Sequence, residues 1–201
     1  MQNQDILAHW SAQEETVTTF SLEPLLPFGF QPTTVAFLTT IGLPEQAAPF
    51  LSFYHQVPGT AGGLYRVQQA YELDESFAGY IAIGCDCMGN PLVINTQQQD
   101  RIEWLDHEDD FASAYVNASL GALASCIVVY EQFIQRVQQE EGGDAYVDAR
   151  FTDAQFTALE EALRAEDAQA VEHEEEEARF WQVELMGLLA NRENNQELNR
   201  N

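Results

Sequence analysis

The sequence predicts an α+β fold with a central, mostly antiparallel β-sheet, flanking helices and a helical C-terminal part. Two observations favour this fold. Short runs rich in aromatic and branched residues alternate with turn residues between positions 44 and 107, which is typical of antiparallel strands. From position 117 onward, apolar residues recur at three- and four-residue steps, which is typical of helices that pack through one face.

The chain length favours one domain. A chain of 201 residues buries about 70% of the surface that its unfolded form exposes, which is enough for one core without disulfides or a metal. We assign residues 1–190 to a single α+β domain. Residues 191–201, which contain RENNQELNRN, are expected to form a frayed polar tail.

Two helices are expected before the strands. The opening stretch is amphipathic and carries apolar residues at helical spacing. These residues are Ile6, Leu7 and Trp10. Pro32 fits the first turn of a second helix, over about residues 32–41, and Gly42 and Pro44 end this helix.

Five strands follow, and the two faces of the last one can be assigned. The strands are expected within residues 49–57, 62–73, 79–85, 91–96 and 101–107. In the last strand, Ile102 and Trp104 share one face, whereas Glu103 and Leu105 share the other, because successive side chains alternate. We expect helices to cover one face of this sheet.

The C-terminal part is expected to contain three helices. They lie within residues 118–139, 152–167 and 178–191. Asn117 or Ser119 is placed to cap the first of them, which is the longest, and Thr152 or Asp153 is placed to cap the second. The apolar stripe of the longest helix is interpreted as core that faces the sheet.

The stretch CDCMGNP, residues 85–91, raises the question of a thiol or metal site. Cys85 and Cys87 lack both the spacing and the second ligand pair of a zinc site, and they precede a strand rather than the helix of a redox-active pair. Asp86, Gly89 and Asn90 tolerate left-handed backbone angles. We therefore interpret the stretch as a hairpin turn, with no metal and no cofactor.

The charge of the chain is strongly negative. It has 33 acidic residues against eight arginines and no lysine, and its formal net charge is -25. Such a chain repels nucleic acid and anionic membranes, because it offers no basic patch to bind phosphate groups. A cationic protein surface is the natural partner, although an acidic surface also serves solubility alone.

The chain shows no signal for export. The N-terminal stretch MQNQDILAHWSAQEE carries no basic side chain and no unbroken apolar run, so we expect no secretory signal peptide. No segment has the length and apolarity of a membrane span. Three cysteines, an odd number, argue against a disulfide framework. A cytoplasmic location is expected.

Two acidic segments are candidates for partner binding. The first is WLDHEDDF, residues 104–111, and the second is EHEEEE, residues 172–177. Neighbouring side chains in a strand or coil point in different directions, so they rarely converge on one metal ion. Contact with a cationic partner and simple solvation both stay open as interpretations. The candidate partner-binding residues are Trp104, Asp106, Glu108, Asp109, Asp110, Glu174, Glu175 and Glu176.

Nothing in the sequence supports catalysis. The four histidines, at positions 9, 55, 107 and 173, share no spacing that would place two of them on one helix face. No nucleophile motif and no phosphate-binding glycine loop occurs. A metal-dependent or thiol enzyme built on Cys85, Cys87 and His107 is the least favoured hypothesis.

Four segments follow one another in a characteristic order. They are FLTTIGLP, YIAIGCDCMGNPLVIN, RIEWLDHE and YVNASLGALASCIVVYEQF. Together they resemble the SUKH superfamily, which includes cell-wall-assembly regulators, Syd-like proteins and many bacterial immunity proteins. Within it, the chain resembles the fourth SUKH immunity group. The matching positions are Gly42 to Pro44, Ile83 with Gly84, Asn117 with Ser119 and Leu120, and residues 161–181.

The resemblance implies a function as well as a fold. It implies an α+β domain without catalysis or cofactor that binds and neutralises a cognate bacterial toxin, often a nuclease or deaminase. The negative charge fits a basic toxin. The alternative is a SUKH-fold regulatory or scaffold module that binds another basic protein. The residues expected to serve turns are Gly42, Pro44, Gly84, Gly89 and Asn90.

Overall fold

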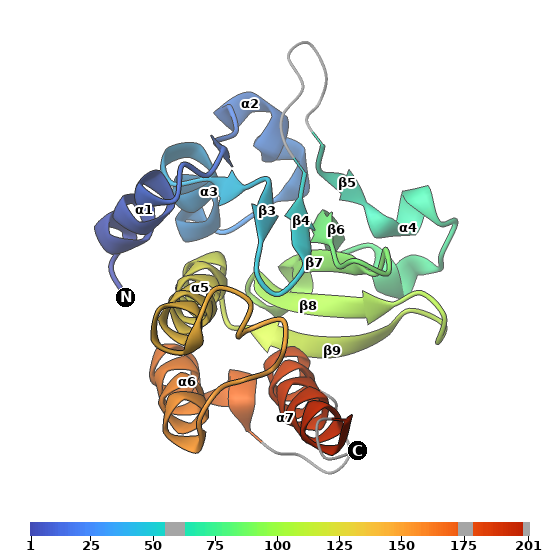
Figure 1. The fold of residues 1–201 in the computed structure, drawn as a ribbon. Coiled ribbons are helices and arrows are strands. Elements are labelled where there is room, and N and C mark those ends of the chain that lie inside the picture. Colours follow the sequence, from blue (N-terminus) through green and yellow to red (C-terminus); the bar gives the residue numbers. More distant parts are fainter. Residues whose placement is uncertain (55–62, 173–178, 199–201) are drawn as a thin grey trace.

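The computed structural model describes residues 1–54, 63–172 and 179–198, and within them seven strands form one antiparallel sheet (Figure 1). Six strands run in the order β3-β4-β6-β7-β8-β9, and β5 pairs with β6 beside β4. The α+β fold and the antiparallel sheet are therefore confirmed. The strands are β3 (Gln46–Ala47), β4 (Leu51–Phe53), β5 (Tyr65–Arg66), β6 (Tyr80–Cys85), β7 (Pro91–Asn95), β8 (Arg101–Asp106) and β9 (Ala112–Asn117).

Helices surround this sheet, and a separate two-stranded pair joins β1 (Val17–Thr18) to β2 (Leu43–Pro44). The α-helices are α1 (Asn3–Ala12), α2 (Leu22–Leu25), α3 (Pro32–Thr40), α4 (Val67–Ala70), α5 (Leu120–Glu141), α6 (Asp153–Glu166) and α7 (Phe180–Leu198). Short 3-10 helices occupy Leu26–Phe28, Glu75–Phe77, Thr96–Gln98 and Ala168–Val171. Among the described helices, none combines the length and apolarity needed to cross a bilayer.

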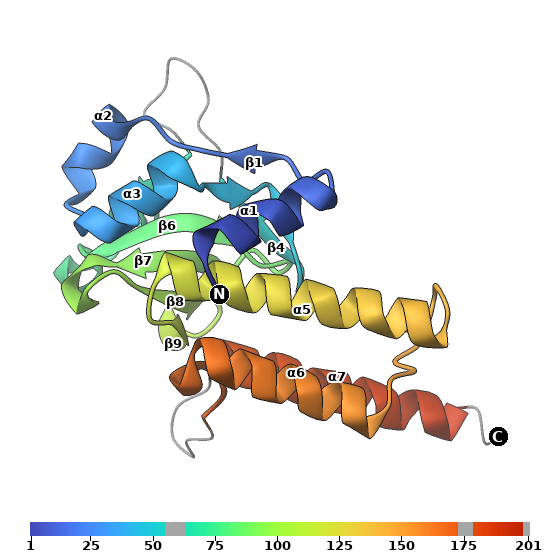
Figure 2. The ribbon, with the colours of Figure 1, turned by 90° about the vertical axis from the view of Figure 1, so that its left-hand side faces the viewer.

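The main core lies between the sheet and α5. Figure 2 shows α5 with α1 and α3 on one side and α6 on the other. Trp10 of α1, Tyr130 of α5 and Trp181 of α7 are almost completely buried in this one cluster. Burial of large aromatic side chains supplies much of the apolar area that stabilises a fold.

A smaller apolar cluster covers the opposite face of the sheet beneath α4. It consists of Val67, Ala82, Val93 and Leu105. Ile102 belongs to the main cluster and Trp104 packs against it, so the alternation expected for β8 is confirmed. Helices were expected to cover one face, and α4 adds a short cover to the second.

One element prediction was wrong, and one strand was not predicted. Residues 62–73 were expected to form a strand, but only Tyr65 and Arg66 pair with β6, and the next four residues form α4, which buries Val67 against the sheet. Conversely, no strand was expected where β9 lies. Its small residues Ala112 and Ser113 have a weak strand preference, and pairing with β8 decides the outcome.

The caps of the two long C-terminal helices agree with the sequence. Ser119 caps α5 by accepting the backbone N–H of Ala122, and Thr152 caps α6 in a reciprocal arrangement with Gln155. Residues 191–198, assigned to a polar tail, continue α7. Asn195 there donates to the carbonyl of Asp148.

Two glycines sit where chain segments approach closely. Gly42 has a φ of +79°, and a Cβ at this position would collide with the carbonyl oxygen of Thr18 in β1. A Cβ at Gly84 would collide with the carbonyl oxygen of Ser52 in β4. Both positions therefore require glycine, since any side chain would push paired strands apart. Pro44, the third residue of GLP, is buried in β2.

Candidate partner-binding surface

The structure describes one of the two acidic segments identified in the sequence. Trp104 is half-buried in β8, Asp106 ends this strand, and Glu108, Asp109 and Asp110 occupy the exposed turn that leads to β9. These five residues lie at one end of the β8–β9 hairpin. Glu174, Glu175 and Glu176 lie outside the described residues.

The turn between β6 and β7 packs against Trp104. Asp86 organises this turn, because its Oδ1 accepts the backbone N–H groups of Met88 and Asn90, both at 2.9 Å. Its Oδ2 accepts the indole N–H of Trp104 at 2.8 Å. Gly89 has a φ of +87°, as a tight turn requires. The hairpin turn predicted for CDCMGNP is thus confirmed.

A second link joins this turn to the acidic segment. Asn90 is buried, and its Oδ1 accepts the backbone N–H of His107 at 3.1 Å and lies 2.6 Å from Nδ1 of the same histidine. Asn90 and Asp86 therefore hold the β6–β7 turn and the end of β8 in a fixed relation. A surface held this way needs little ordering when a partner binds.

The turn between β3 and β4 projects an aromatic side chain beside Trp104. Phe50 is 68% exposed and is the most exposed aromatic residue in the described part of the chain. Its φ of +60° places a bulky residue in the left-handed region. Both features are unfavourable for folding alone, since this backbone conformation costs about 1 to 3 kcal/mol in a residue other than glycine.

An apolar pocket of about 200 Å³ lies among these elements and α7. Met88 and Val183 reach into solvent at its rim and are 70% and 54% exposed, respectively. We call it the Trp104 pocket and define it by Phe50, Asp86, Met88, Trp104, Phe180, Val183 and Glu184. Aromatic and methionine side chains around a hollow, rimmed by charge, are typical of the centre of a protein–protein interface.

Two carboxylates of the pocket are electrostatically distinct. Burial acts to raise the pKa of Asp86, but hydrogen bonds from Asn90 and Trp104 and from the turn backbone outweigh it and lower the pKa below its usual value. Burial, helped by the negative charge of Asp86, raises the pKa of Glu184 to about 7. A cationic group placed here would favour the ionised form of Glu184.

The arginines offset little of the negative charge at this surface, because most of them pair with carboxylates elsewhere. Within the described ranges, five form ion pairs with nearby carboxylates, and Arg66 donates to the carbonyls of Ala78 and Pro27. Arg179 is the one arginine among the described residues that line the pocket, and its guanidinium lies 5.2 Å from the ring centre of Tyr115. The five ion-paired arginines are Arg101, Arg136, Arg150, Arg164 and Arg192.

Metal-binding groups and the cysteines were the other candidates for a site. No group of three or more His, Cys, Asp or Glu side chains in this part of the chain could hold a metal ion. Cys126 is buried in α5, and burial raises the pKa of its thiol to about 12, so this thiol is a poor nucleophile. Cys87 is exposed at the tip of the β6–β7 turn.

Among the residues that line the Trp104 pocket, the sequence pointed to Trp104 as a candidate for partner binding. It did not point to Phe50, Met88, Val183 or Glu184. The sequence pattern places Phe50 in a strand, where an aromatic side chain is normally half-buried. The neighbouring Pro49 was a signal for a turn at this point. Val183 and Glu184 follow buried positions of α7, so only the packing of that helix reveals that they line a pocket.

Comparisons with known proteins give one match. A family model described as SUKH-4 immunity protein matches residues 5–189, which is nearly the whole chain. Neither the search of curated proteins nor that of solved structures finds a match.

Proposed function

Because the chain belongs to the SUKH-4 immunity protein family, we propose that it neutralises its cognate polymorphic toxin by covering a basic surface of that toxin. Membership of this family makes the protein a non-catalytic partner of a toxin. The proposed toxin is a nuclease or a deaminase, since an enzyme that handles nucleic acid presents a positive surface to its substrate. A protein of net charge -25 is attracted to such a surface.

The proposed contact surface consists of the Trp104 pocket and the acidic turn at Asp106, Glu108, Asp109 and Asp110. Charge alone supplies attraction and selectivity, whereas tight inhibition requires a desolvated apolar centre. The proposed surface combines both, because the turn that brings Asp86 and Met88 to the pocket is also bonded, through Asn90, to His107 within the acidic segment. Glu174, Glu175 and Glu176 are proposed to extend the acidic surface.

The exposure and backbone conformation of Phe50 give the proposal its main support. Its side chain is 68% exposed on a backbone held at a φ of +60°, so the ring adds little buried apolar area to the fold while the backbone conformation is unfavourable. Residues held in this way are typical of functional sites. Insertion of Phe50 into a pocket of the toxin would bury its ring and account for both features.

Growth rescue tests the proposal. A polymorphic toxin whose gene neighbours the gene of this protein is the candidate, and it is expressed in a bacterial host with the wild-type protein or with Phe50→Ala. We expect the wild-type protein to restore growth, and Phe50→Ala to bind the toxin at least about 30-fold more weakly, as is typical of a central aromatic residue. Leu26→Ala is the matched control, because Leu26 is 65% exposed in a different part of the fold.

Two outcomes would contradict the proposal. If the wild-type protein fails to restore growth and does not bind the toxin, this protein is not the antagonist of that toxin. If Phe50→Ala binds as tightly as the wild-type protein, the toxin contacts a different surface. Circular dichroism of each variant shows that the fold is retained.

A further inference from the structure

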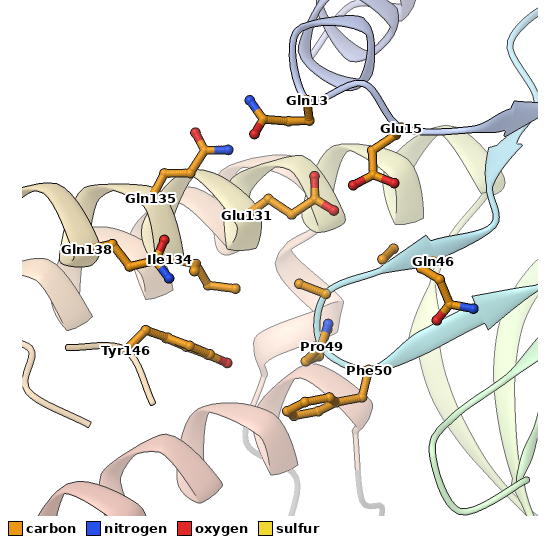
Figure 3. A pocket seen from close by; sticks show the side chains of 12 residues that line it. Gln13, Glu15, Gln46, Pro49, Phe50, Glu131, Ile134, Gln135, Gln138 and Tyr146 are labelled. Atoms are coloured by element: carbon orange, nitrogen blue, oxygen red, sulfur yellow. The ribbon is translucent and has the colours of Figure 1, made fainter. Parts of the chain in front are cut away.

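A second and wider hollow lies on the other side of the Phe50 turn. Its volume is about 450 Å³, and it is bounded by the end of α1, the β3–β4 turn, α5 and the loop that follows α5 (Figure 3). Pro49 and Phe50 line both this hollow and the Trp104 pocket. A partner that covers one of them therefore reaches the other.

The polar groups of this hollow are acidic or neutral. Glu15 and Glu131 supply two carboxylates, and four glutamines supply amide oxygens, whereas no arginine is among the described residues that line it. Figure 3 shows Glu15 and Glu131 along one wall of the hollow. The glutamines are Gln13, Gln46, Gln135 and Gln138.

Glu131 is the more buried of the two carboxylates and is hydrogen-bonded to a histidine. Its side chain is only 14% exposed, and its Oε2 lies 2.9 Å from Nε2 of His9. Burial raises the pKa of Glu131, and the negative charge of Glu15 adds to this effect, although the bond to His9 and the backbone N–H of Ala48 act against it. A further cation beside these two carboxylates would relieve their repulsion.

The rest of the lining is apolar and aromatic. Ile134 lies on α5 three residues after Glu131, whereas the rings of Tyr146 and Phe50 face the hollow from the side opposite Glu131 (Figure 3). Aliphatic stems of long basic side chains pack on such surfaces while their charged ends reach polar groups. A planar guanidinium also stacks on aromatic rings, and its five N–H groups need more acceptors than the three of an ammonium group.

We propose that this hollow, defined by Glu15, Phe50, Glu131, Ile134 and Tyr146, receives an arginine side chain of the toxin. The inference rests on the proposed function, because it names the chemistry of one toxin residue at the same surface. The guanidinium bonds to Glu15 and Glu131 and to the glutamine amides, while the stem of the arginine packs on Ile134 and Tyr146.

A titration without toxin tests the hollow itself. Nα-acetyl-L-arginine-N-methylamide is added to the full-length protein at millimolar concentrations, and backbone amide shifts are followed by NMR. We expect saturable shifts at residues 46–48, at Phe50 and at residues 131–138. The equally capped citrulline, which has the same shape without the charge, is expected to produce no saturable shift. Equal shifts with the two compounds, or shifts elsewhere only, would overturn the proposal.

Conservative variants sharpen the test. Glu15→Gln with Glu131→Gln removes both charges, yet the amide introduced by the second change retains an acceptor for His9, so the fold is kept. We expect this double variant to bind the arginine probe at least about fivefold more weakly than the wild-type protein. The control is Glu75→Gln, which removes one charge from an exposed 3-10 helix outside the hollow. Unchanged affinity of the double variant would overturn the proposal.

The toxin complex separates this inference from the proposed function. If the wild-type protein binds the toxin and the double variant binds at least about tenfold more weakly, the arginine site is supported. If the wild-type protein and the double variant bind equally well, the inference is wrong while the proposed function stands. If the wild-type protein does not bind, the proposed function fails, and the probe titration alone decides on the hollow.

Discussion

Phe50 and Trp104 contribute to the surface in different ways. Trp104 is half-buried, packs on the main core and donates to Asp86, so it fixes the wall of the pocket. Phe50 is proposed to make the projecting contact, because its side chain is 68% exposed. Replacement of Trp104 is therefore expected to reduce stability as well as binding, whereas replacement of Phe50 affects binding.

Glu184 makes the stability of the protein depend on pH. Its carboxyl ionises near 4.5 in the unfolded chain but only at about 7 in the folded one, because it is buried beside Asp86. The folded chain thus binds more protons between these values, and stability falls as pH rises from about 4.5 to about 7, then stays level. Glu184→Gln removes this loss, so we expect it to be more stable than wild type at pH 8.

Chemical denaturation at two pH values measures this effect. After allowance for the partial exposure of Glu184, the gain of Glu184→Gln at pH 8 is expected to be about 1 to 2 kcal/mol, with almost no gain at pH 4. Glu193→Gln, an exposed change in the same helix, is the control. A gain of equal size at both pH values would show that titration of Glu184 is not the cause.

The hairpin cysteines provide a test of the non-catalytic assignment. We expect Cys85→Ser with Cys87→Ser to protect cells from the toxin as well as the wild-type protein does, because Asp86 and Asn90 organise the turn through their own side chains. Growth rescue and metal analysis of both proteins measure this. Lost protection in a folded double variant would mean that a thiol takes part in the function.

At the scale of elements, one carboxylate joins the C-terminal helices to the sheet. Asp167 follows α6, and its Oδ2 accepts from the Tyr115 hydroxyl at 2.9 Å, the Asn117 side chain at 3.1 Å and the Ala118 backbone at 2.8 Å. Asn117 in turn accepts the indole N–H of Trp181 at 2.9 Å, which anchors α7. The α7 wall of the Trp104 pocket therefore depends on this network.

Removal of Asp167 is expected to be strongly destabilising. Asp167→Ala removes the carboxylate that accepts from the buried Asn117 amide and the half-buried Tyr115 hydroxyl, and leaves Asn117 only the weak acceptor Sγ of Cys126. We expect a loss of about 3 kcal/mol in the free energy of unfolding. Urea denaturation measures the loss. Asp109→Ala, in the exposed turn, is expected to change stability by no more than about 0.5 kcal/mol. If both variants match the wild-type protein, the network does not hold α7 in place.

The elements that the sequence predicted well are those whose signals are local. Local signals include the helix caps at Ser119 and Thr152 and the turn residues from Asp86 to Asn90. Each of them bonds to residues close in the chain, so the local sequence is enough to predict it. The α4 helix and β9 depend on what they pack against, which local patterns do not contain. The Trp104 pocket is of this second kind, because it joins turns and a helix far apart in the chain.

At the scale of the whole molecule, net charge is proposed to govern the approach of the partner. A net charge of -25 would attract a basic toxin over a distance that salt shortens to about 10 Å at 0.1 M. We expect the association rate to fall at least about tenfold between low and high salt, measured by stopped flow, with a smaller change in the dissociation rate. An association rate that is independent of salt would restrict the acidic surface to a role in solubility.

Titration of toxin activity with this protein tests the central claim, non-catalytic neutralisation by binding, most directly. A fixed amount of purified toxin is mixed with increasing amounts of this protein, and the remaining activity and the mass of the toxin are measured. If neutralisation occurs by binding alone, the toxin activity falls linearly to zero at a fixed stoichiometric ratio. The toxin is then recovered chemically intact and active after the two proteins are separated. Complete inactivation by a small fraction of that amount, or a toxin of altered mass, would contradict neutralisation by binding alone.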